Sequence, residues 1–246
     1  MLKLRHVLAV MGVAAIALTG SVATSSAGVT TPADVASIQP AGETVGVAHP
    51  VTVTFVKPVT DRSAIEQTIK FTSPATPEGT FTWLNDRVVQ WNPDGFWPAH
   101  SNITVSVGGV KTNFQSGAEV LGVADISAHT FTVSVDGETL REMPASMGKP
   151  RFPTPQGTFS VIRKEPVVVM DSRTIGIPLD DPEGYRLTVE HAVRITSGGV
   201  YVHSAPWSTG SQGYATVSHG CINLSPDNAA WYFDMVNVGD PVVVQS

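Results

Sequence analysis

Apolar and polar residues alternate over much of this chain, with the two-residue period of a half-buried β-strand. The run Val51-Thr52-Val53-Thr54-Phe55 places its three apolar side chains on one face, and Ile103-Thr104-Val105-Ser106-Val107 does the same. Between them, the turn residues Asn85-Asp86 separate Thr80-Phe81-Thr82-Trp83 from Arg87-Val88-Val89-Gln90-Trp91. Short strands with turn signals at this spacing predict an immunoglobulin-like β-sandwich in the first half of the chain.

The second half continues the strand pattern. Thr130-Phe131-Thr132-Val133-Ser134-Val135 alternates and is followed by Asp136-Gly137, the strongest short hairpin signal in the chain. A further strand is expected over Gly199-Val200-Tyr201-Val202-His203, which would place His203 at its end and Ser204 in the following loop. The segment from Met170 to Tyr185 is rich in glycine and proline and predicts a surface loop.

One short helix is expected near the C-terminal end. Ser225 has the side chain of an N-cap, and Pro226 suits the first helical position. The helix would run through residues 228–236, and Val242-Val243-Val244 would then close the sheet. The chain is therefore predicted to be mainly β, with a short helix after its single cysteine.

Breaks in the strand rhythm divide the chain into segments. Residues 28–37 show no periodicity and predict a flexible linker. A second interruption at Gln115-Ser116-Gly117-Ala118 places a boundary between a domain of residues 38–118 and a domain of residues 119–246. Each is long enough to bury a core of its own.

Residues 1–27 have the pattern of a secretory signal peptide. Lys3 and Arg5 precede an apolar run from Val7 to Leu18, and small residues stand at Ser25-Ser26-Ala27. We expect an exported protein of the periplasm or cell wall. An uncleaved membrane anchor is the alternative, although the apolar run is short for a spanning helix.

Composition narrows the classes of partner and chemistry. The formal net charge of the chain is -6, and removal of a signal peptide that carries two basic residues would make it more acidic, so nucleic acid is not an expected partner. A single cysteine cannot form an intramolecular disulfide. In an exported protein, it leaves either an intermolecular bridge or a free thiol kept for its reactivity.

The candidate chemistry is concentrated where that cysteine and two histidines lie close in sequence. Cys221 would be the nucleophile of covalent acyl transfer, and a nearby imidazole, from His203 or His219, would activate its thiol. Backbone amides at Gly220 and Cys221 would stabilise the oxyanion. Two alternatives remain: a lone cysteine is often a small buried hydrophobe, and the three side chains could bind zinc, although no fourth ligand stands at suitable spacing.

Two other groups of residues have competing interpretations. Trp83, Trp91 and Trp97 could form a carbohydrate-stacking platform, but packing in a core or between domains is the favoured use. The pair Asp180-Asp181 could hold a metal, but no histidine stands at ligand spacing, and a solvated turn is favoured. No metal or cofactor is therefore predicted.

The residues around Cys221 resemble the signature of L,D-transpeptidases with a YkuD-type catalytic domain. The pattern consists of His203-Ser204 and, further on, Ser218-His219-Gly220-Cys221-Ile222-Asn223. Upstream stretches also resemble the family: Thr154-Pro155-Gln156-Gly157-Thr158-Phe159, Val169-Met170-Asp171-Ser172, Gly184-Tyr185 and Ser197-Gly198-Gly199-Val200. The first domain resembles the immunoglobulin-like domain that precedes the catalytic domain in mycobacterial members.

The resemblance implies a role for each matching residue. Cys221 would be the nucleophile, His203 the base, and the backbone carbonyl of Ser204 would orient the imidazole. His219 would shape the oxyanion loop around Gly220, and Asn223 would contact substrate. The residues implied to line the donor pocket, beneath a lid formed by residues 170–185, are Met170, Tyr185, Gly198, Gly199 and Trp207.

The resemblance also implies a reaction and its partners. Cys221 would attack the carbonyl of the third residue of a peptidoglycan tetrapeptide donor, D-alanine would leave, and a diamino-acid amine of a second stem would resolve the thioester into a 3→3 cross-link. Carbapenems would acylate the same thiol. Two alternatives stay open: hydrolysis of the thioester by an L,D-carboxypeptidase or endopeptidase, and a wall-binding module whose catalytic-looking loop is inert.

Overall fold

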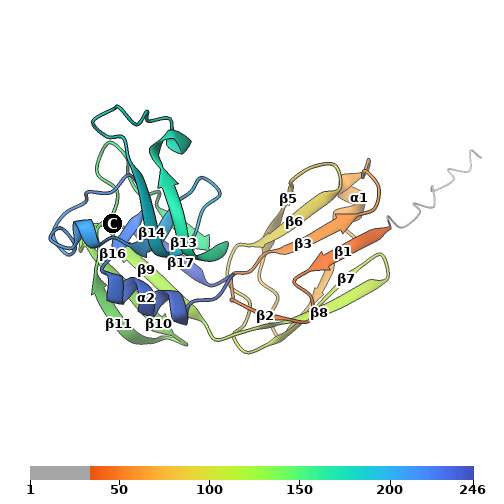
Figure 1. The fold of residues 1–246 in the computed structure, drawn as a ribbon. Coiled ribbons are helices and arrows are strands. Elements are labelled where there is room, and N and C mark those ends of the chain that lie inside the picture. The colour runs from red at the N-terminus through yellow and green to blue at the C-terminus, as the bar shows by residue number, and fades with distance from the viewer. Residues whose placement is uncertain (1–33) are drawn as a thin grey trace, which may run out of the picture. The chain divides into compact units, whose positions relative to one another are not determined.

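Strands dominate the computed structural model, which describes residues 34–246 (Figure 1). The predicted signal peptide and the start of the predicted linker lie outside the described residues. No helix within residues 34–246 has the length and apolar character needed to cross a membrane.

The first domain consists of two four-stranded sheets. One has the order β1-β3-β6-β5 and the other the order β2-β8-β7-β4. The first sheet contains β1 (Val35–Gln39), β3 (Val51–Phe55), β6 (Val88–Pro93) and β5 (Gly79–Trp83). The second contains β2 (Thr44–Val45), β8 (Val110–Ser116), β7 (Asn102–Val107) and β4 (Lys70–Thr72), and a short helix α1 (Arg62–Glu66) precedes β4.

The core of this sandwich is the one that the alternation predicts. Val51, Val53 and Phe55 of β3 are all buried, while the residues between them are half-buried. Trp91 and Trp97 are 5% and 1% exposed, and their ring centroids lie 5.0 Å apart. Trp83 packs against the same core. The preferred interpretation of the tryptophans as packing residues is therefore confirmed.

The predicted linker 28–37 extends too far, because strand β1 begins at Val35. β1 pairs antiparallel with β3 at the edge of its sheet, and a register shift separates Val35 from Ser37. Only Ile38 of this strand is fully buried. An irregular edge strand exposes most of its side chains on both faces, so no clean alternation marks it in the sequence.

The second domain contains a five-stranded and a four-stranded sheet. The first, in the order β11-β10-β9-β17-β12, consists of β11 (Glu138–Pro144), β10 (Thr130–Val135), β9 (Val120–Asp125), β17 (Pro241–Gln245) and β12 (Gly157–Ser160). The second, in the order β13-β14-β15-β16, consists of β13 (Arg163–Asp171), β14 (Arg186–Arg194), β15 (Tyr201–Ser204) and β16 (Ile222–Leu224).

Local signals place two of these features as predicted. Asp136 and Gly137 connect β10 to β11 with φ angles of 50° and 86°, the left-handed conformation that a tight hairpin turn requires. Helix α2 (Pro226–Met235) is capped by Ser225, whose hydroxyl accepts the Asn228 N–H. Its Ala229 and Tyr232 are buried, and the Tyr232 ring packs edge-on against Phe131 of β10. The helix thereby anchors the chain just after β16.

Backbone hydrogen bonds connect the segment after β2 to the segment before β17. The N–H groups of Gly46 and Ala48 donate to the carbonyls of Val238 and Gly239 at 2.9 and 2.8 Å. A Cβ on Gly46 would stand 2.0 Å from the backbone nitrogen of Asp240. This close approach therefore requires a residue without a side chain.

Candidate active site

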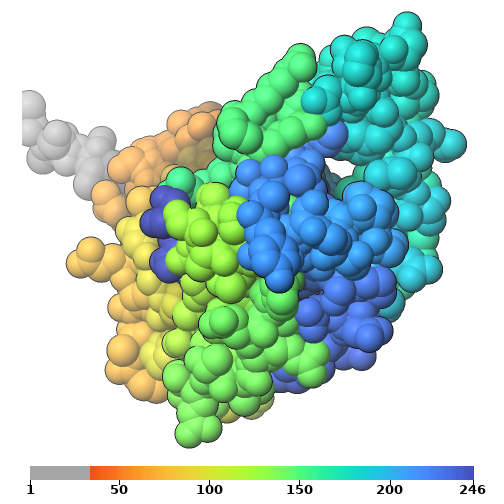
Figure 2. Space-filling view, turned by 90° about the vertical axis from the view of Figure 1, so that its left-hand side faces the viewer, coloured from red at the N-terminus to blue at the C-terminus, as the bar shows by residue number. Residues whose placement is uncertain are grey.

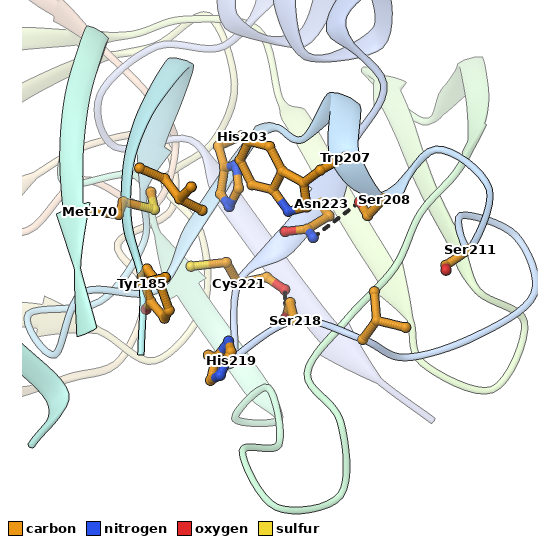
Figure 3. Close-up of a pocket in the computed structure, with 12 residues that line it drawn as sticks. Met170, Tyr185, His203, Trp207, Ser208, Ser211, Ser218, His219, Cys221 and Asn223 are labelled. Carbon is orange, nitrogen blue, oxygen red and sulfur yellow. Dashed lines mark hydrogen bonds between the residues drawn. The ribbon is translucent and has the colours of Figure 1, made fainter. Parts of the chain in front are cut away.

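A cavity of about 400 Å³ opens beside the second sheet of the C-terminal domain. Figure 2 shows an opening between the teal surface of the β13–β14 region and the blue surface of the segment that follows β15. The residues that line the cavity, drawn in Figure 3, are Met170, Tyr185, Leu187, His203, Trp207, Ser208, Ser211, Val217, Ser218, His219, Cys221 and Asn223. Both histidines of the sequence signature and its cysteine are among them.

Strand register explains why His203 and Cys221 meet. β15 and β16 run parallel, and His203 is the register partner of Asn223. Cys221 stands two residues before Asn223, so both side chains point to the same face. Figure 3 shows the imidazole, the thiol and the Asn223 amide turned toward one cavity. Eighteen residues apart in sequence, His203 and Cys221 are thus neighbours across two adjacent strands.

The sequence predicted Ser204 in the loop after the strand. In the structure, Ser204 is the last residue of β15. It pairs with Leu224 in the parallel ladder, which extends the strand by one residue beyond His203. The carbonyl oxygen of Ser204 lies 2.7 Å from Nδ1 of His203. A carbonyl can only accept, so Nδ1 carries the proton, and Nε2 of the neutral ring keeps its lone pair.

The environment of His203 keeps the ring neutral. His203 is 3% exposed, and burial lowers its pKa to about 4, although the hydrogen bond to Ser204 acts in the opposite direction. The imidazole at neutral pH is therefore a neutral base with its free nitrogen available in the cavity.

The same burial keeps Cys221 protonated. Burial raises the pKa of its thiol to about 11. The sulfur lies 3.9 Å from the carbonyl oxygen of Gly199, a weak contact that a thiol can make as donor. Both shifts favour a neutral thiol and a neutral imidazole over a thiolate–imidazolium ion pair.

The loop before Cys221 is held by Ser218. Its hydroxyl donates to the Cys221 carbonyl at 2.6 Å and accepts the Gly220 N–H at 3.1 Å. Gly220 has a φ of +114°, which a residue with a Cβ rarely adopts. The Gly220 amide that the sequence suggested as an oxyanion donor is thus engaged by Ser218, because the tight loop turns it inward.

His219 points toward the lid segment. Its Nε2 lies 2.9 Å from Oε2 of Glu183, which also forms an ion pair with Lys149. The His219 ring lies between Phe152 and Tyr185, with centroid distances of 4.9 Å to each. The pKa of Glu183 is held below its usual range, chiefly by Lys149 and further by His219. His219 is therefore a wall of the cavity with its Nε2 already occupied.

The lid segment is shorter than the predicted loop 170–185. Met170 and Asp171 belong to β13 and pair with Leu187 and Arg186 of β14. The β13–β14 hairpin therefore includes Met170 and Asp171. The sequence predicted a loop there because the residues that follow are rich in glycine and proline. Beyond it, a short 3-10 helix η1 (Ser172–Ile175) leads into the loop that ends at Tyr185.

Asn223 and Trp207 lie on the side of the cavity away from the lid. The Asn223 amide donates to Ser208 Oγ at 3.2 Å. Ser208 ends a second short 3-10 helix, η2 (Pro206–Ser208), which places Trp207 at the rim, 51% exposed and with its ring centroid 6.1 Å from that of His203. The sequence signature named Asn223 and Trp207, but gave no sign of Ser208.

Sequence comparison with known proteins shows the family to which the chain belongs. Residues 119–244 match the L,D-transpeptidase catalytic domain (YkuD), and residues 9–111 match a bacterial Ig domain. L,D-transpeptidase 1 of Mycobacterium tuberculosis is 61% identical over 211 residues, which cover 85% of this chain and 84% of that protein. The chain belongs to the L,D-transpeptidase family.

Solved structures agree with this assignment. An L,D-transpeptidase from Mycobacterium smegmatis is 72% identical, with a TM-score of 0.85 over 88% of this chain and 100% of that one. The structure of LD transpeptidase LdtMt1 in complex with imipenem is 60% identical, with a TM-score of 0.82 over 86% of this chain and 99% of that one. The predicted fold class, an Ig-like domain followed by a YkuD domain, is confirmed.

Not every residue that the resemblance placed in the pocket of this L,D-transpeptidase lines the cavity. Met170, Tyr185, Trp207 and Asn223 line it, and Gly199 contacts Cys221 through its carbonyl. Gly198 is exposed and does not line it. The turn that contains both glycines directs only the second toward the sulfur.

The structure also tests the zinc alternative. Within residues 34–246, no group of three or more His, Cys, Asp or Glu side chains is arranged to hold a metal ion. His219 is directed at Glu183, and the Nδ1 of His203 is occupied by Ser204. Of the three signature side chains, His203 and Cys221 share the cavity, whereas Nε2 of His219 is held by Glu183.

Proposed function

We propose that this L,D-transpeptidase forms 3→3 peptidoglycan cross-links through a thioester on Cys221, with His203 as general base. The observation that carries the proposal is the Nδ1 contact of His203 with the Ser204 carbonyl, at 2.7 Å. It fixes the tautomer whose Nε2 accepts a proton, in the cavity that the Cys221 thiol lines. No aspartate is needed to orient the ring.

Acylation begins with the neutral pair. As Sγ of Cys221 attacks the carbonyl carbon of the third residue of a tetrapeptide donor, Nε2 of His203 takes the thiol proton. The tetrahedral intermediate then collapses, the bond to the terminal D-alanine breaks, and the imidazolium returns its proton to the departing amine. The products of this half-reaction are the thioester and free D-alanine.

Transfer reverses the roles of thiol and amine. The side-chain amine of a diamino acid in a second stem attacks the thioester carbonyl, and His203 takes a proton from the attacking nitrogen. The thiolate leaves and recovers that proton, which restores the starting pair. If water replaced the amine, the same steps would give a carboxypeptidase or endopeptidase.

The oxyanion of both intermediates requires backbone donors. Since the Gly220 N–H is engaged by Ser218, the Cys221 N–H is the donor that this loop offers. Met170, Tyr185 and Trp207 supply apolar and aromatic walls for the donor peptide, and Asn223, held by Ser208, supplies a polar contact.

Carbapenems are proposed as covalent inhibitors of the same thiol. Relatives at 60% and 52% identity are described as a complex with imipenem and with a faropenem-derived adduct. The strained carbonyl of a β-lactam is an electrophile for Cys221, like the donor carbonyl in the first half-reaction. When the ring opens, its nitrogen stays attached to the acyl group, so no amine diffuses away.

The test is product analysis by mass spectrometry of the protein mixed with disaccharide-tetrapeptide fragments, with Cys221→Ala as control. We expect cross-linked dimers and one released D-alanine per dimer, both absent with the variant. Disaccharide-tripeptide without dimers would instead support a carboxypeptidase. Unchanged fragments with both proteins would support an inert wall-binding module.

A further inference from the structure

Three loops of the catalytic domain meet at one carboxylate. Glu183 comes from the loop that precedes β14, Lys149 from the segment after β11, and His219 from the loop before Cys221. Lys149 Nζ pairs with Oε2 of Glu183, and Nε2 of His219 lies 2.9 Å from the same oxygen. None of the reaction steps proposed above uses Glu183 or Lys149.

The carboxylate fixes the orientation of His219. A carboxylate oxygen accepts, so Nε2 of His219 donates the proton, and the ring cannot act as a base through this nitrogen. Phe152 and Tyr185 hold the ring between them, with interplanar angles of 38° and 48°. A single ring position is therefore set by one hydrogen bond and two aromatic contacts.

The same contacts connect the lid loop to the cysteine loop. Lys149 also donates its backbone N–H to the Ser218 carbonyl at 3.0 Å. On the lid side, the Glu183 N–H donates to Asp181, and a Cβ on the next residue, Gly184, would stand 2.4 Å from the Pro178 carbonyl oxygen. Glu183 is thus presented from a tightly folded loop, and His219 stands two residues before the reacting sulfur.

A displacement of His219 would also move the Cys221 N–H, the proposed oxyanion donor. Gly220, the residue between His219 and Cys221, has a φ of +114°, a conformation with few intrinsic restraints on a glycine. The N–H of Cys221 must point at a developing charge, and catalysis is sensitive to misplacement of such donors. Ser218 holds the Gly220 N–H and the Cys221 carbonyl, and the side chain of His219 adds a second restraint on the same loop from Glu183.

We infer that Glu183 is a positioning residue for acylation, which holds the Cys221 amide in place by way of His219. This inference rests on the proposed function, because it assigns Glu183 a part in stabilising the oxyanion of that reaction.

Two reactions of the same sulfur separate this role from a general loss of structure. Acylation by a carbapenem passes through an oxyanion, whereas alkylation by iodoacetamide needs the activated thiol but forms no oxyanion. For Glu183→Ala in the full-length protein, we expect acylation to slow at least about 10-fold. Alkylation should stay within about two-fold of wild type, since the contacts of His203 with Ser204 are unchanged.

Further variants calibrate the result. Glu183→Gln keeps an acceptor oxygen in nearly the same shape, so its acylation rate should lie between those of wild type and Glu183→Ala. Asp180→Asn, an exposed carboxylate of the same loop, should leave both reactions unchanged. In a His219→Ala background, Glu183→Ala should cost little more, because the two side chains act as one unit.

Several outcomes would overturn the inference. These are acylation of Glu183→Ala at the wild-type rate, an equal loss in both reactions for a variant that melts like wild type, or losses from Glu183 and His219 that multiply. If Glu183→Ala fails to fold, the isosteric Glu183→Gln decides by the same comparison. A wild-type protein that no carbapenem acylates would instead refute the proposed function.

Discussion

The surroundings of His203 and Cys221 favour the uncharged form of both side chains. With the pKa of His203 lowered to about 4 and that of Cys221 raised to about 11, neither group is charged at neutral pH. In the proposed mechanism, the thiol proton therefore moves to His203 during the attack. A neutral pair avoids the cost of two buried charges, which is large when they are not otherwise compensated.

This protonation state predicts opposite pH profiles for wild type and His203→Ala. Wild-type acylation by a carbapenem should be nearly independent of pH between about 5 and 9, because both groups titrate outside that window. The variant depends on spontaneous thiolate, so its rate should rise about ten-fold per pH unit, from a deficit of at least about 100-fold at pH 7. Stopped-flow measurement of acylation from pH 5 to 9 checks both slopes.

A deficit that is the same at every pH would contradict the assignment of His203 as base. Parallel profiles would show that the imidazole does not take the thiol proton. The role would then pass to another group, although His219 is poorly suited because Glu183 occupies its Nε2.

Gly220→Ala should impair the cysteine loop through its backbone. The φ of +114° disfavours any Cβ, whereas the space itself would accept one, since the nearest atoms lie 3.8 Å away. We expect a strain of about 1–3 kcal/mol, released by a shift of the loop, and acylation at least about 10-fold slower. The control is Gly210→Ala, at a position with open space and no positive φ. Equal rates for the two variants would contradict the requirement for glycine at 220.

A buried hydroxyl connects the two ends of the loop between β13 and β14. Ser172 Oγ donates to the Ile177 carbonyl at 2.9 Å and accepts the Tyr185 N–H at 3.0 Å. It is fully buried, so its removal leaves both backbone groups unsatisfied, at a cost of about 1–3 kcal/mol. The pocket residue Tyr185 then keeps the hydrogen bond of its carbonyl with the Ser172 N–H but loses that of its own N–H.

We therefore predict that Ser172→Ala raises the KM for the tetrapeptide donor several-fold and lowers the Tm by a few degrees. Thr174→Ala, an exposed hydroxyl of the same short helix, should change neither. Donor titrations and thermal melts measure both effects. An unchanged KM in a folded Ser172→Ala protein would show that this loop does not shape the donor site.

Elements with a local signal are those that the sequence predicted well. Alternation located β3, β7 and β10, and the Ser225-Pro226 pair located the start of α2. Strand β1 escaped because an edge strand exposes most of its residues. The Met170 end of β13 escaped because pairing with β14 across the intervening loop overrode its local turn composition.

The residues of the active site also divide into those that the sequence identified and those that it did not. His203, Cys221 and the Ser204 carbonyl were identifiable because their motif is contiguous and long. Glu183 and Lys149 were not, since they stand 34 residues apart and no spacing rule relates loops that meet only in the folded domain. The one available hint was that Glu183 directly precedes Gly184-Tyr185, a stretch that already resembled the family.

Across the whole molecule, each domain has its own hydrophobic core. One core draws only on residues from Ile38 to Phe114, and the other only on residues from Val120 to Val244. All residues that line the catalytic cavity come from Met170 onward. The Ig-like domain contributes no side chain to this lining.

A fragment that begins near Ser116 should therefore still be acylated at Cys221 by a carbapenem. Its Tm should fall, because the Val238 and Gly239 carbonyls lose the N–H donors of Gly46 and Ala48. Intact mass and a thermal melt check the two statements. A folded fragment that fails to react would show that the Ig-like domain contributes directly to the site.

The most direct test of the proposed mechanism is the intact mass of the protein after it is mixed with a tetrapeptide donor, before and after an amine acceptor is added. We predict an adduct of the donor minus D-alanine on Cys221, its loss when the acceptor is added, and its absence in Cys221→Ala. Cross-linked product without an adduct on Cys221, or with Cys221→Ala, would contradict it.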